Sequence, residues 1–398
     1  MSGEAQQSLE ELAGVFRKWL HLPNLDVLYV TLATIAANRI PGVPVWLMLI
    51  GPSSGGKTET LLSVADLPDI YVVGTLSGEA ALLSGSSKKD CSPDATGGLL
   101  PQVGKFGIIV CKDFTSILSM RRDKRAEILA ALREIYDGSW TRPLGVDGGR
   151  TLEWKGKLGL MAGCTGVIDS HHAVIAAMGE RFVFFRLPKL DATRQAEEAL
   201  KHADQDSTMR RELRRAVAGF FEGLGSLPKR HPQLTEPERH RLIALAELAV
   251  RCRSAVERDS FTREVQSVPD AELPARLVKV LAQLLAGLKL IGVNRARAWH
   301  IIVKVALDSM PAIRRKVFNK LRGTESATIE SLGLQCPDVT VRRALEDLRA
   351  HGVVDRSGAG HQKSDRWSLS LWARRQYETA TGSFSEMSGK NGRFRNVG

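Results

Sequence analysis

The residues whose types and spacing suit chemistry most clearly form one short run, Gly51-Pro52-Ser53-Ser54-Gly55-Gly56-Lys57-Thr58. Its glycines allow the backbone to curl into a concave nest of N–H groups, a shape that suits phosphate oxygens. Lys57 is spaced to reach the outer phosphates of a nucleotide, and Thr58 offers a hydroxyl to Mg²⁺. The run fits G-x-x-x-x-G-K-[ST] at every fixed position. We therefore predict nucleoside triphosphate binding here, rather than a plain Gly/Ser surface loop.

A strand and a helix must hold this loop in place. Val45–Ile50 is a short apolar run that predicts a buried strand, and a helix is expected from about Lys57 to Val64 with its positive dipole end at the phosphates. Further strands are predicted at Ile70–Val73, Ile108–Cys111, Leu158–Ala162 and Phe182–Phe185. Strands that alternate with helices predict a parallel, helix-covered sheet that binds ligands at the carboxyl ends of its strands.

Other segments show helix or hairpin patterns. Residues 1 to about 24, Asp26–Ile40 and Asp123–Tyr136 have helical spacing of apolar residues. Trp140–Trp154 alternates around a glycine-rich centre, which predicts a hairpin. From Ala192 to about Asn319 only helical patterns are visible.

The C-terminal part changes character after these helices. Short helices are predicted at Thr328–Leu332 and Asp338–His351, and short strands at Val353–Arg356 and Arg366–Leu369. Two helices followed by a two-stranded wing predict a winged helix-turn-helix. A Gly/Ser/Asn-rich tail, expected to be disordered, follows from about Thr379.

The charge, cysteine pattern and hydropathy of the chain limit which partners and which cellular location are expected. The formal net charge is +12, and from Pro311 to the end 16 Lys/Arg face 9 Asp/Glu, which points to nucleic acid unless this is only a solvated basic surface. Five scattered cysteines contain no Cys-x-x-Cys pair, so a disulfide framework or structural zinc site is not expected. No apolar run has membrane-spanning length, and the N-terminus is polar, so no membrane partner and a cytoplasmic location are expected.

The order of these parts resembles the AAA+ ATPases and, within them, the minichromosome maintenance (MCM) ring helicases. Gly51–Thr58 resembles Walker A, Ile108–Phe114 lies where Walker B belongs, and Glu272–Leu277 resembles the start of the lid helix. The resemblance implies an α/β P-loop NTPase (AAA+) core with N-terminal helices at 1–191, a helical lid at 192–322, a C-terminal winged helix-turn-helix at 323–378 and a tail at 379–398. Only about 40 residues precede the first strand, so we expect a short member of the mobile-element kind.

Hydrolysis needs a metal, a group that activates water, and positive charge near the γ-phosphate. The resemblance assigns the phosphates to Lys57 and the Mg²⁺ to Thr58 and Asp113. The family places Asp-Glu before the Phe, whereas this chain has Lys112-Asp113 before Phe114. Either Asp113 stands in for the water-activating Glu, or the frame slips by one and Asp113 holds Mg²⁺ with no Glu after it. Both registers leave one carboxylate, which predicts slow or conditional hydrolysis; a mere helix cap is the alternative for Asp113.

Three further roles follow from the resemblance alone. Thr165 lies at the sensor-1 position, Arg181 lies in the arginine-finger segment directly before Phe182–Phe185, and Arg276 on the lid helix resembles sensor 2. The finger would reach the γ-phosphate of a neighbouring subunit. The alternatives are a local strand cap for Thr165, an ion pair with Glu180 for Arg181, and an ordinary helix-surface arginine for Arg276.

DNA contacts are expected at two places. The hairpin lies where MCM proteins carry a pore hairpin, and Arg142 and Arg150 flank its tip, although an ordinary exposed hairpin is equally open. Lys88 and Lys89 would belong to a second pore loop.

In the winged helix, Arg342 and Arg343 lie near the start of the predicted recognition helix, and His361 and Lys363 lie at the wing tip. Winged helices also bind proteins, so that reading stays open.

The sequence thus favours an oligomeric, MCM-like ATPase that uses ATP and Mg²⁺ and acts on DNA as a helicase or translocase in mobile-element replication. The implied partners are DNA, further copies in a ring expected to be a hexamer, and replication or recombination proteins. The main alternative is a DNA-bound ATP switch, such as a helicase loader, a transposition regulator or a nucleoprotein remodeller. A small-molecule P-loop kinase would leave the winged helix and the lid without a role.

Overall fold

The computed structural model describes residues 2–84, 97–145, 149–172, 180–189, 191–230, 233–259, 261–358 and 365–382. Its chain divides into two compact units. The first contains Met1–His231 and Gln283–Val305, and the second contains Pro232–Ala282 and Ala306–Gly398.

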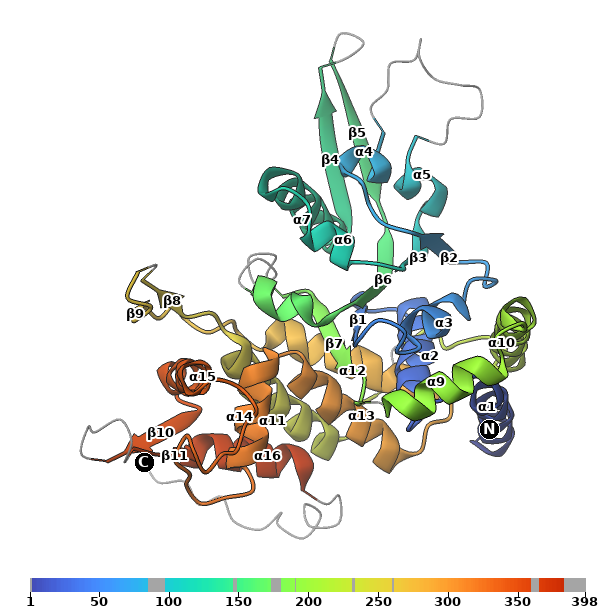
Figure 1. The fold of residues 1–398 in the computed structure, drawn as a ribbon. Helices are drawn as coiled ribbons and strands as arrows, with labels where there is room; N and C mark the ends of the chain where they lie inside the picture. Colours follow the sequence, from blue (N-terminus) through green and yellow to red (C-terminus); the bar gives the residue numbers. More distant parts are fainter. Residues whose placement is uncertain are drawn as a thin grey trace. The chain divides into compact units, whose positions relative to one another are not determined.

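A five-stranded sheet forms the centre of the first unit, in the order β2-β3-β6-β1-β7 (Figure 1). Every neighbouring pair of strands is parallel. The strands are β1 (Trp46–Ile50), β2 (Ile70–Val73), β3 (Phe106–Cys111), β6 (Lys157–Cys164) and β7 (Phe182–Arg186). The predicted α/β fold with a parallel sheet and flanking helices is confirmed, and it is consistent with a P-loop NTPase.

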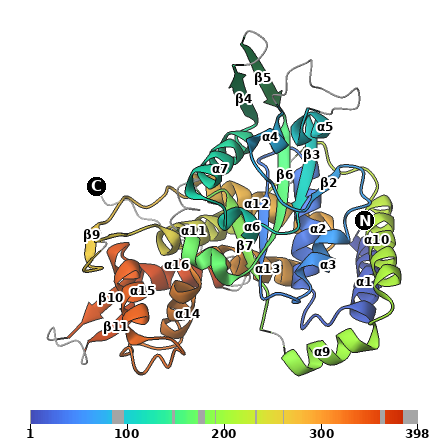
Figure 2. The same cartoon turned by 45° about the horizontal axis from the view of Figure 1, so that its top comes forward.

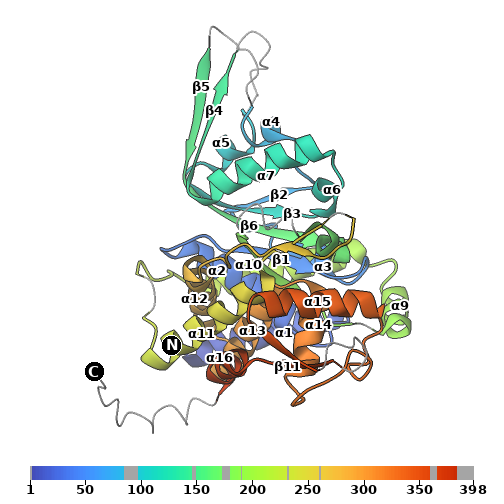
Figure 3. The ribbon, with the colours of Figure 1, turned by 90° about the vertical axis from the view of Figure 1, so that its left-hand side faces the viewer.

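The strands are apolar on both faces because both faces are covered. All five residues of β1 are buried. On one face Ile128, Leu132 and Ile135 of α7 (Arg122–Tyr136) join a core with the strands, and Figure 3 shows α7 along that side of the sheet. On the other side of β1, the side-chain amide of Asn38 makes two hydrogen bonds with the backbone of Val45. It donates to the carbonyl of Val45 at 3.0 Å and accepts from its N–H at 2.9 Å.

The remaining elements of the first unit surround this sheet. The β4–β5 hairpin, which was predicted at Trp140–Trp154, projects from it (Figure 1). Near the N-terminus, Lys18 and Trp19 both donate to Glu212 at 2.7 Å, so α1 and α10 are joined. The elements are α1 (Ser2–Trp19), α2 (Asp26–Arg39), α3 (Lys57–Leu62), α4 (Glu79–Leu82), α5 (Leu99–Val103), α6 (Thr115–Leu118), β4 (Ser139–Leu144), β5 (Arg150–Lys155), η2 (Gly166–His171), α9 (Ala192–Lys201) and α10 (Asp206–Gly223).

The second unit is mostly helical and also contains two small antiparallel ribbons. Figure 2 shows α15 beside the β10–β11 ribbon. The elements are α11 (Glu236–Arg253), β8 (Glu257–Arg258), β9 (Val265–Ser267), α14 (Ala312–Leu321), α15 (Asp338–Ala350), β10 (Val354–Ser357), β11 (Arg366–Leu369) and α16 (Leu371–Thr381). Two further helices each have residues in both units: α12 (Ala275–Leu290) and α13 (Arg295–Asp308).

Two local predictions in the second unit are wrong. The β8–β9 ribbon replaces part of the purely helical stretch. Thr328–Leu332 forms turns rather than a helix, because the hydroxyls of Thr328 and Ser331 each accept the other residue's backbone N–H, at 3.2 and 2.8 Å.

Within the described part of the chain, no helix is both long enough and apolar enough to cross a membrane.

Candidate nucleotide site

The phosphate loop leaves the carboxyl end of β1 and enters α3. The N–H of Gly51 donates to the carbonyl of Cys164 at 3.2 Å, which fixes the start of the loop to the end of β6. Ser54 and Gly56 have positive φ angles of 60° and 79°, and Gly56 directly precedes α3. These left-handed conformations turn the chain sharply, as a nest of N–H groups requires.

Lys57 is the buried cation of this loop. Its ammonium donates to the carbonyls of Gly51 and Pro52, at 2.8 and 2.5 Å. Burial lowers the pKa of Lys57, and the nearby carboxylate of Asp113 opposes that shift. The side chain is therefore folded back along its own loop, where phosphate oxygens could replace the two carbonyls as acceptors.

Asp113 and Thr165 lie at the ends of the neighbouring strands and are linked through one residue. Asp113 follows β3, is exposed, and its carboxylate accepts the N–H of Thr115 at 2.9 Å. The hydroxyl of Thr115 in turn accepts the N–H of Thr165 at 3.2 Å, and it donates to the Cys164 thiol at 3.6 Å. Burial raises the pKa of the Cys164 thiol, so it stays protonated.

The sequence reasoning missed Thr115 and Cys164. The Asp-x-Thr spacing, which is typical of an Asx turn, was the available signal for Thr115.

The Mg²⁺ prediction concerns Thr58 and Asp113. Both are exposed; Thr58 lies in α3, which follows β1, and Asp113 follows β3, with β6 between these two strands. No group of three or more His, Cys, Asp or Glu side chains that could hold a metal occurs among the described residues. Because Mg²⁺ commonly binds through one or two protein oxygens together with phosphates and water, such a sparse set fits it.

A pocket of about 520 Å³ opens beside the loop, a size within the usual range for small ligands. Ser54 to Glu59 form one wall, and α1, α9 and α10 form the others. The Trp19 and His202 rings meet there with centroids 4.9 Å apart. Gln195 donates to the carbonyl of Ser54 at 3.3 Å, which ties α9 to the loop. Nothing in the spacing of the sequence indicates these wall residues, because they are far apart along the chain.

Arg181 lies at the opposite, amino-terminal edge of the sheet, directly before β7. Its guanidinium donates to the Asp137 carboxylate at 2.7 Å and lies over the Tyr136 ring at 5.4 Å. The residue is only 5% exposed. Asp137 is therefore a partner of Arg181 within the same subunit.

The two hairpin arginines have half-buried side chains. Arg142 donates to the carbonyl of Leu83 at 2.6 Å and lies 3.6 Å from the carboxylate of Glu79. It thus joins the hairpin to α4. Arg150 begins β5 and pairs in register with Leu144.

The remaining predicted residues belong to the second unit or fall outside the described residues. Arg276 donates to Glu272 at 3.1 Å. Arg342 and Arg343 lie on α15 with half-buried side chains. Lys88, Lys89, His361 and Lys363 lie outside the described residues.

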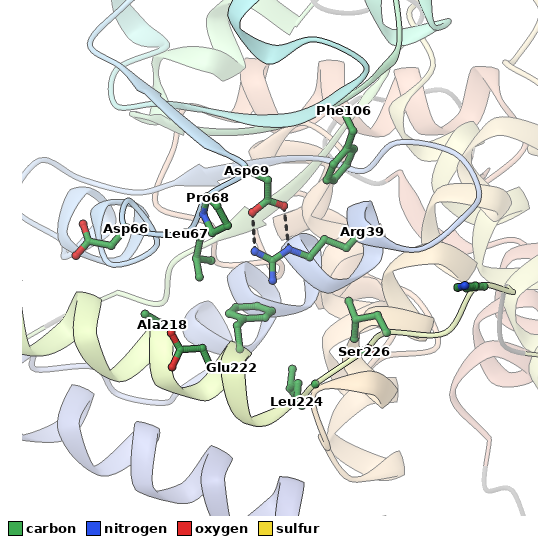
Figure 4. Close-up of a pocket in the computed structure, with 14 residues that line it drawn as sticks. Arg39, Asp66, Leu67, Pro68, Asp69, Phe106, Ala218, Glu222, Leu224 and Ser226 are labelled. Carbon is green, nitrogen blue, oxygen red and sulfur yellow. Dashed lines mark hydrogen bonds and ion pairs between the residues drawn. The ribbon is translucent and has the colours of Figure 1, made fainter.

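A second pocket, of about 700 Å³, lies beside β2 and contains none of the predicted site residues. Figure 4 shows Arg39 facing Asp69 within it, and two bonds of 2.8 and 2.6 Å join their side chains. Arg39 also lies over the Phe221 ring at 4.6 Å. This pocket is separate from the phosphate loop.

A comparison with protein-family models and a comparison with curated proteins found no match to this chain.

Proposed function

We propose that this chain is an ATPase of the AAA+ class, similar to MCM proteins, that acts on DNA as an oligomeric helicase or translocase. One observation carries the nucleotide part of the proposal. The phosphate loop, Asp113 and Thr165 come from the carboxyl ends of three neighbouring strands and share one edge, where Thr115 links the last two. This edge is where parallel sheets of the α/β kind bind ligands.

The geometry supports a separate role for each site residue when Mg²⁺-ATP is bound. Lys57 would exchange its two carbonyl acceptors for β- and γ-phosphate oxygens, since charged acceptors bind an ammonium more strongly. Thr58 and Asp113 would hold the metal, and Thr165 would orient the attacking water. Arg181 would reach a neighbouring subunit's γ-phosphate only after leaving Asp137.

The DNA part of the proposal rests on the second unit. Its helix α15 carries Arg342 and Arg343 near the start and is followed by the β10–β11 ribbon, an order that suits a winged helix. The excess of basic residues after Pro311 favours a polyanionic partner.

A DNA-bound ATP switch with slow hydrolysis is the second candidate. It is favoured by the one carboxylate at the end of β3 and by the engagement of Arg181 with Asp137. A switch needs nucleotide-dependent states but tolerates slow turnover.

Turnover and strand separation distinguish the two candidates. ATP hydrolysis is measured with and without single-stranded DNA, together with displacement of a labelled strand from a forked duplex, and Lys57→Ala serves as the inactive control. A motor should show DNA-stimulated hydrolysis and displacement. Nucleotide-dependent DNA binding without displacement would favour the switch, and absence of ATP binding would refute both.

A further inference from the structure

A short antiparallel ribbon in the second unit displays a highly exposed aromatic side chain. We call the described residues Glu257–Asp259 and Phe261–Asp270, which contain β8 and β9, the arm (Figure 1). Phe261 at its tip is 97% exposed, and Val265 and Val268 are also exposed. Every residue from Phe261 to Asp270 is classed as exposed. Ten consecutive exposed residues that include a nearly fully exposed phenylalanine and two partly exposed valines suit a contact surface.

The arm is anchored to α15 by an inward-facing arginine. The Arg258 guanidinium donates to Asp347 at 2.7 Å, to Glu346 at 3.1 Å and to the carbonyl of Arg343 at 3.0 Å. It also donates to the carbonyl of Arg263 at 2.8 Å, which closes the ribbon on itself. Several charge-assisted bonds to one fork-shaped group hold the base of the arm in a defined direction.

The tip is ordered by Asp259. Its carboxylate accepts the N–H groups of Phe261 and Thr262, both at 2.7 Å, and these bonds lower the pKa of Asp259. Arg263 follows with a φ angle of 62°, which is uncommon for a non-glycine residue. The turn is thus built with Phe261 pointing away from its own chain. A pre-ordered aromatic group loses little conformational freedom on binding and suits the centre of an interface.

The charge of the arm indicates its partner. Four carboxylates and two arginines lie between Glu257 and Asp270, a formal charge of −2, and Arg258 is already engaged with α15. Such a surface repels nucleic acid, although the neighbouring α15 carries arginines. The chain as a whole has a formal charge of +12, so a second copy of it attracts an acidic arm electrostatically.

We propose that the arm is a self-association element, in which Phe261 inserts into the surface of a second copy of this chain. Arm and receiving surface are different patches, so the contact is heterologous and can close into a ring. The proposal rests on the oligomer of the proposed function and names the element that builds it.

Variants of the arm test this. Phe261→Ala should weaken self-association by about 10- to 30-fold, as expected for an aromatic interface anchor. Asp259→Ala keeps the phenyl ring but releases the turn, and should weaken association in the same direction. Leu371→Ala is the matched control, because Leu371 is 63% exposed but lies on α16. Association is measured by sedimentation with ATP and DNA present.

A photo-cross-linking residue at position 261 identifies what the arm touches. A covalent dimer of this chain from position 261, and none from position 371, would support the proposal. Cross-links to DNA, or an unchanged association of Phe261→Ala, would overturn it. Fluorescent ATP binding is measured in the same samples. A Phe261→Ala protein that still forms oligomers and binds ATP would refute the arm alone, and a monomeric wild-type protein would refute the proposed oligomer together with the arm. Oligomers without ATP binding would refute the nucleotide site alone.

Discussion

Two basic residues at opposite edges of the central sheet, Lys57 and Arg181, are held by different kinds of partner. At the carboxyl edge, the ammonium of Lys57 donates to two backbone carbonyls of its own loop, beside a pocket. At the amino edge, Arg181 is paired with a carboxylate and stacked on a ring, and Lys157 donates to the carbonyl of Ile40 at 2.7 Å.

The difference concerns what each cation would lose when a ligand arrives. Lys57 would exchange neutral acceptors for charged phosphate oxygens, a gain in electrostatic energy. Arg181 would have to leave the Asp137 carboxylate and the Tyr136 ring. Its interaction with a neighbouring subunit's γ-phosphate must therefore offset the loss of these two contacts. The phosphate loop can therefore exchange neutral acceptors for those of a ligand, whereas Arg181 is already engaged within its own subunit.

The sharpest test of this contrast is Arg181→Ala. If Arg181 acts on a neighbouring subunit, DNA-stimulated hydrolysis should fall by about 1,000-fold while ATP affinity stays unchanged. Asp137→Asn removes the cis carboxylate and keeps the guanidinium, so it should retain turnover or raise it. Steady-state hydrolysis and fluorescent nucleotide titration measure both quantities. Normal turnover of Arg181→Ala would mean that Arg181 has only a structural role, in its ion pair with Asp137.

Lys57→Ala probes the carboxyl edge directly. Loss of the ammonium should weaken ATP binding by about 100-fold, because the phosphate oxygens lose a charge-assisted partner. Lys105→Ala is the matched control, since this exposed lysine directly precedes β3, at the amino edge of the sheet. Equal affinity of Lys57→Ala and wild type in a titration would contradict the assignment of the site.

Asp113→Asn tests the one carboxylate at the end of β3. Turnover should fall by about 10- to 100-fold with higher Mg²⁺ required, because the metal or the attacking water loses its anionic partner. Asp123→Asn, which changes a surface carboxylate on α7, should have no effect. Hydrolysis is measured across a Mg²⁺ series. An unaltered Mg²⁺ dependence would make Asp113 a helix cap through its bond to Thr115.

The smallest effect is expected at Lys157. Burial lowers the pKa of Lys157 to about 8, whereas a lysine in an unfolded chain titrates near 10.4. Between these values the unfolded state binds more protons, so the free energy of unfolding should rise with pH, by about 1 kcal/mol after allowance for solvent screening. Lys157→Met should flatten that rise. Denaturant unfolding at about pH 7 and about pH 10 compares the two proteins, and parallel pH profiles would contradict the shifted pKa.

The sequence by itself determined the strands of the sheet and the phosphate loop. The strands are short apolar runs that depend on local composition and on burial from both sides, as β1 shows with five buried residues. The loop is eight consecutive residues whose glycines, lysine and threonine act through spacing alone, so no distant contact is needed to recognise it. The errors in the predicted strand ends were small because turn residues bound most of these runs.

Only the tertiary structure decided which side chains face each other across long separations. Asp137 and Arg181 are 44 positions apart, and Trp19 meets His202 from another helix. Arg258 donates to Asp347 across 89 positions. This contact anchors the β8–β9 ribbon within a stretch whose sequence pattern predicts helices. Such pairings depend on how elements pack, and residue spacing carries no record of them, because a periodic pattern reports burial but not the identity of the partner.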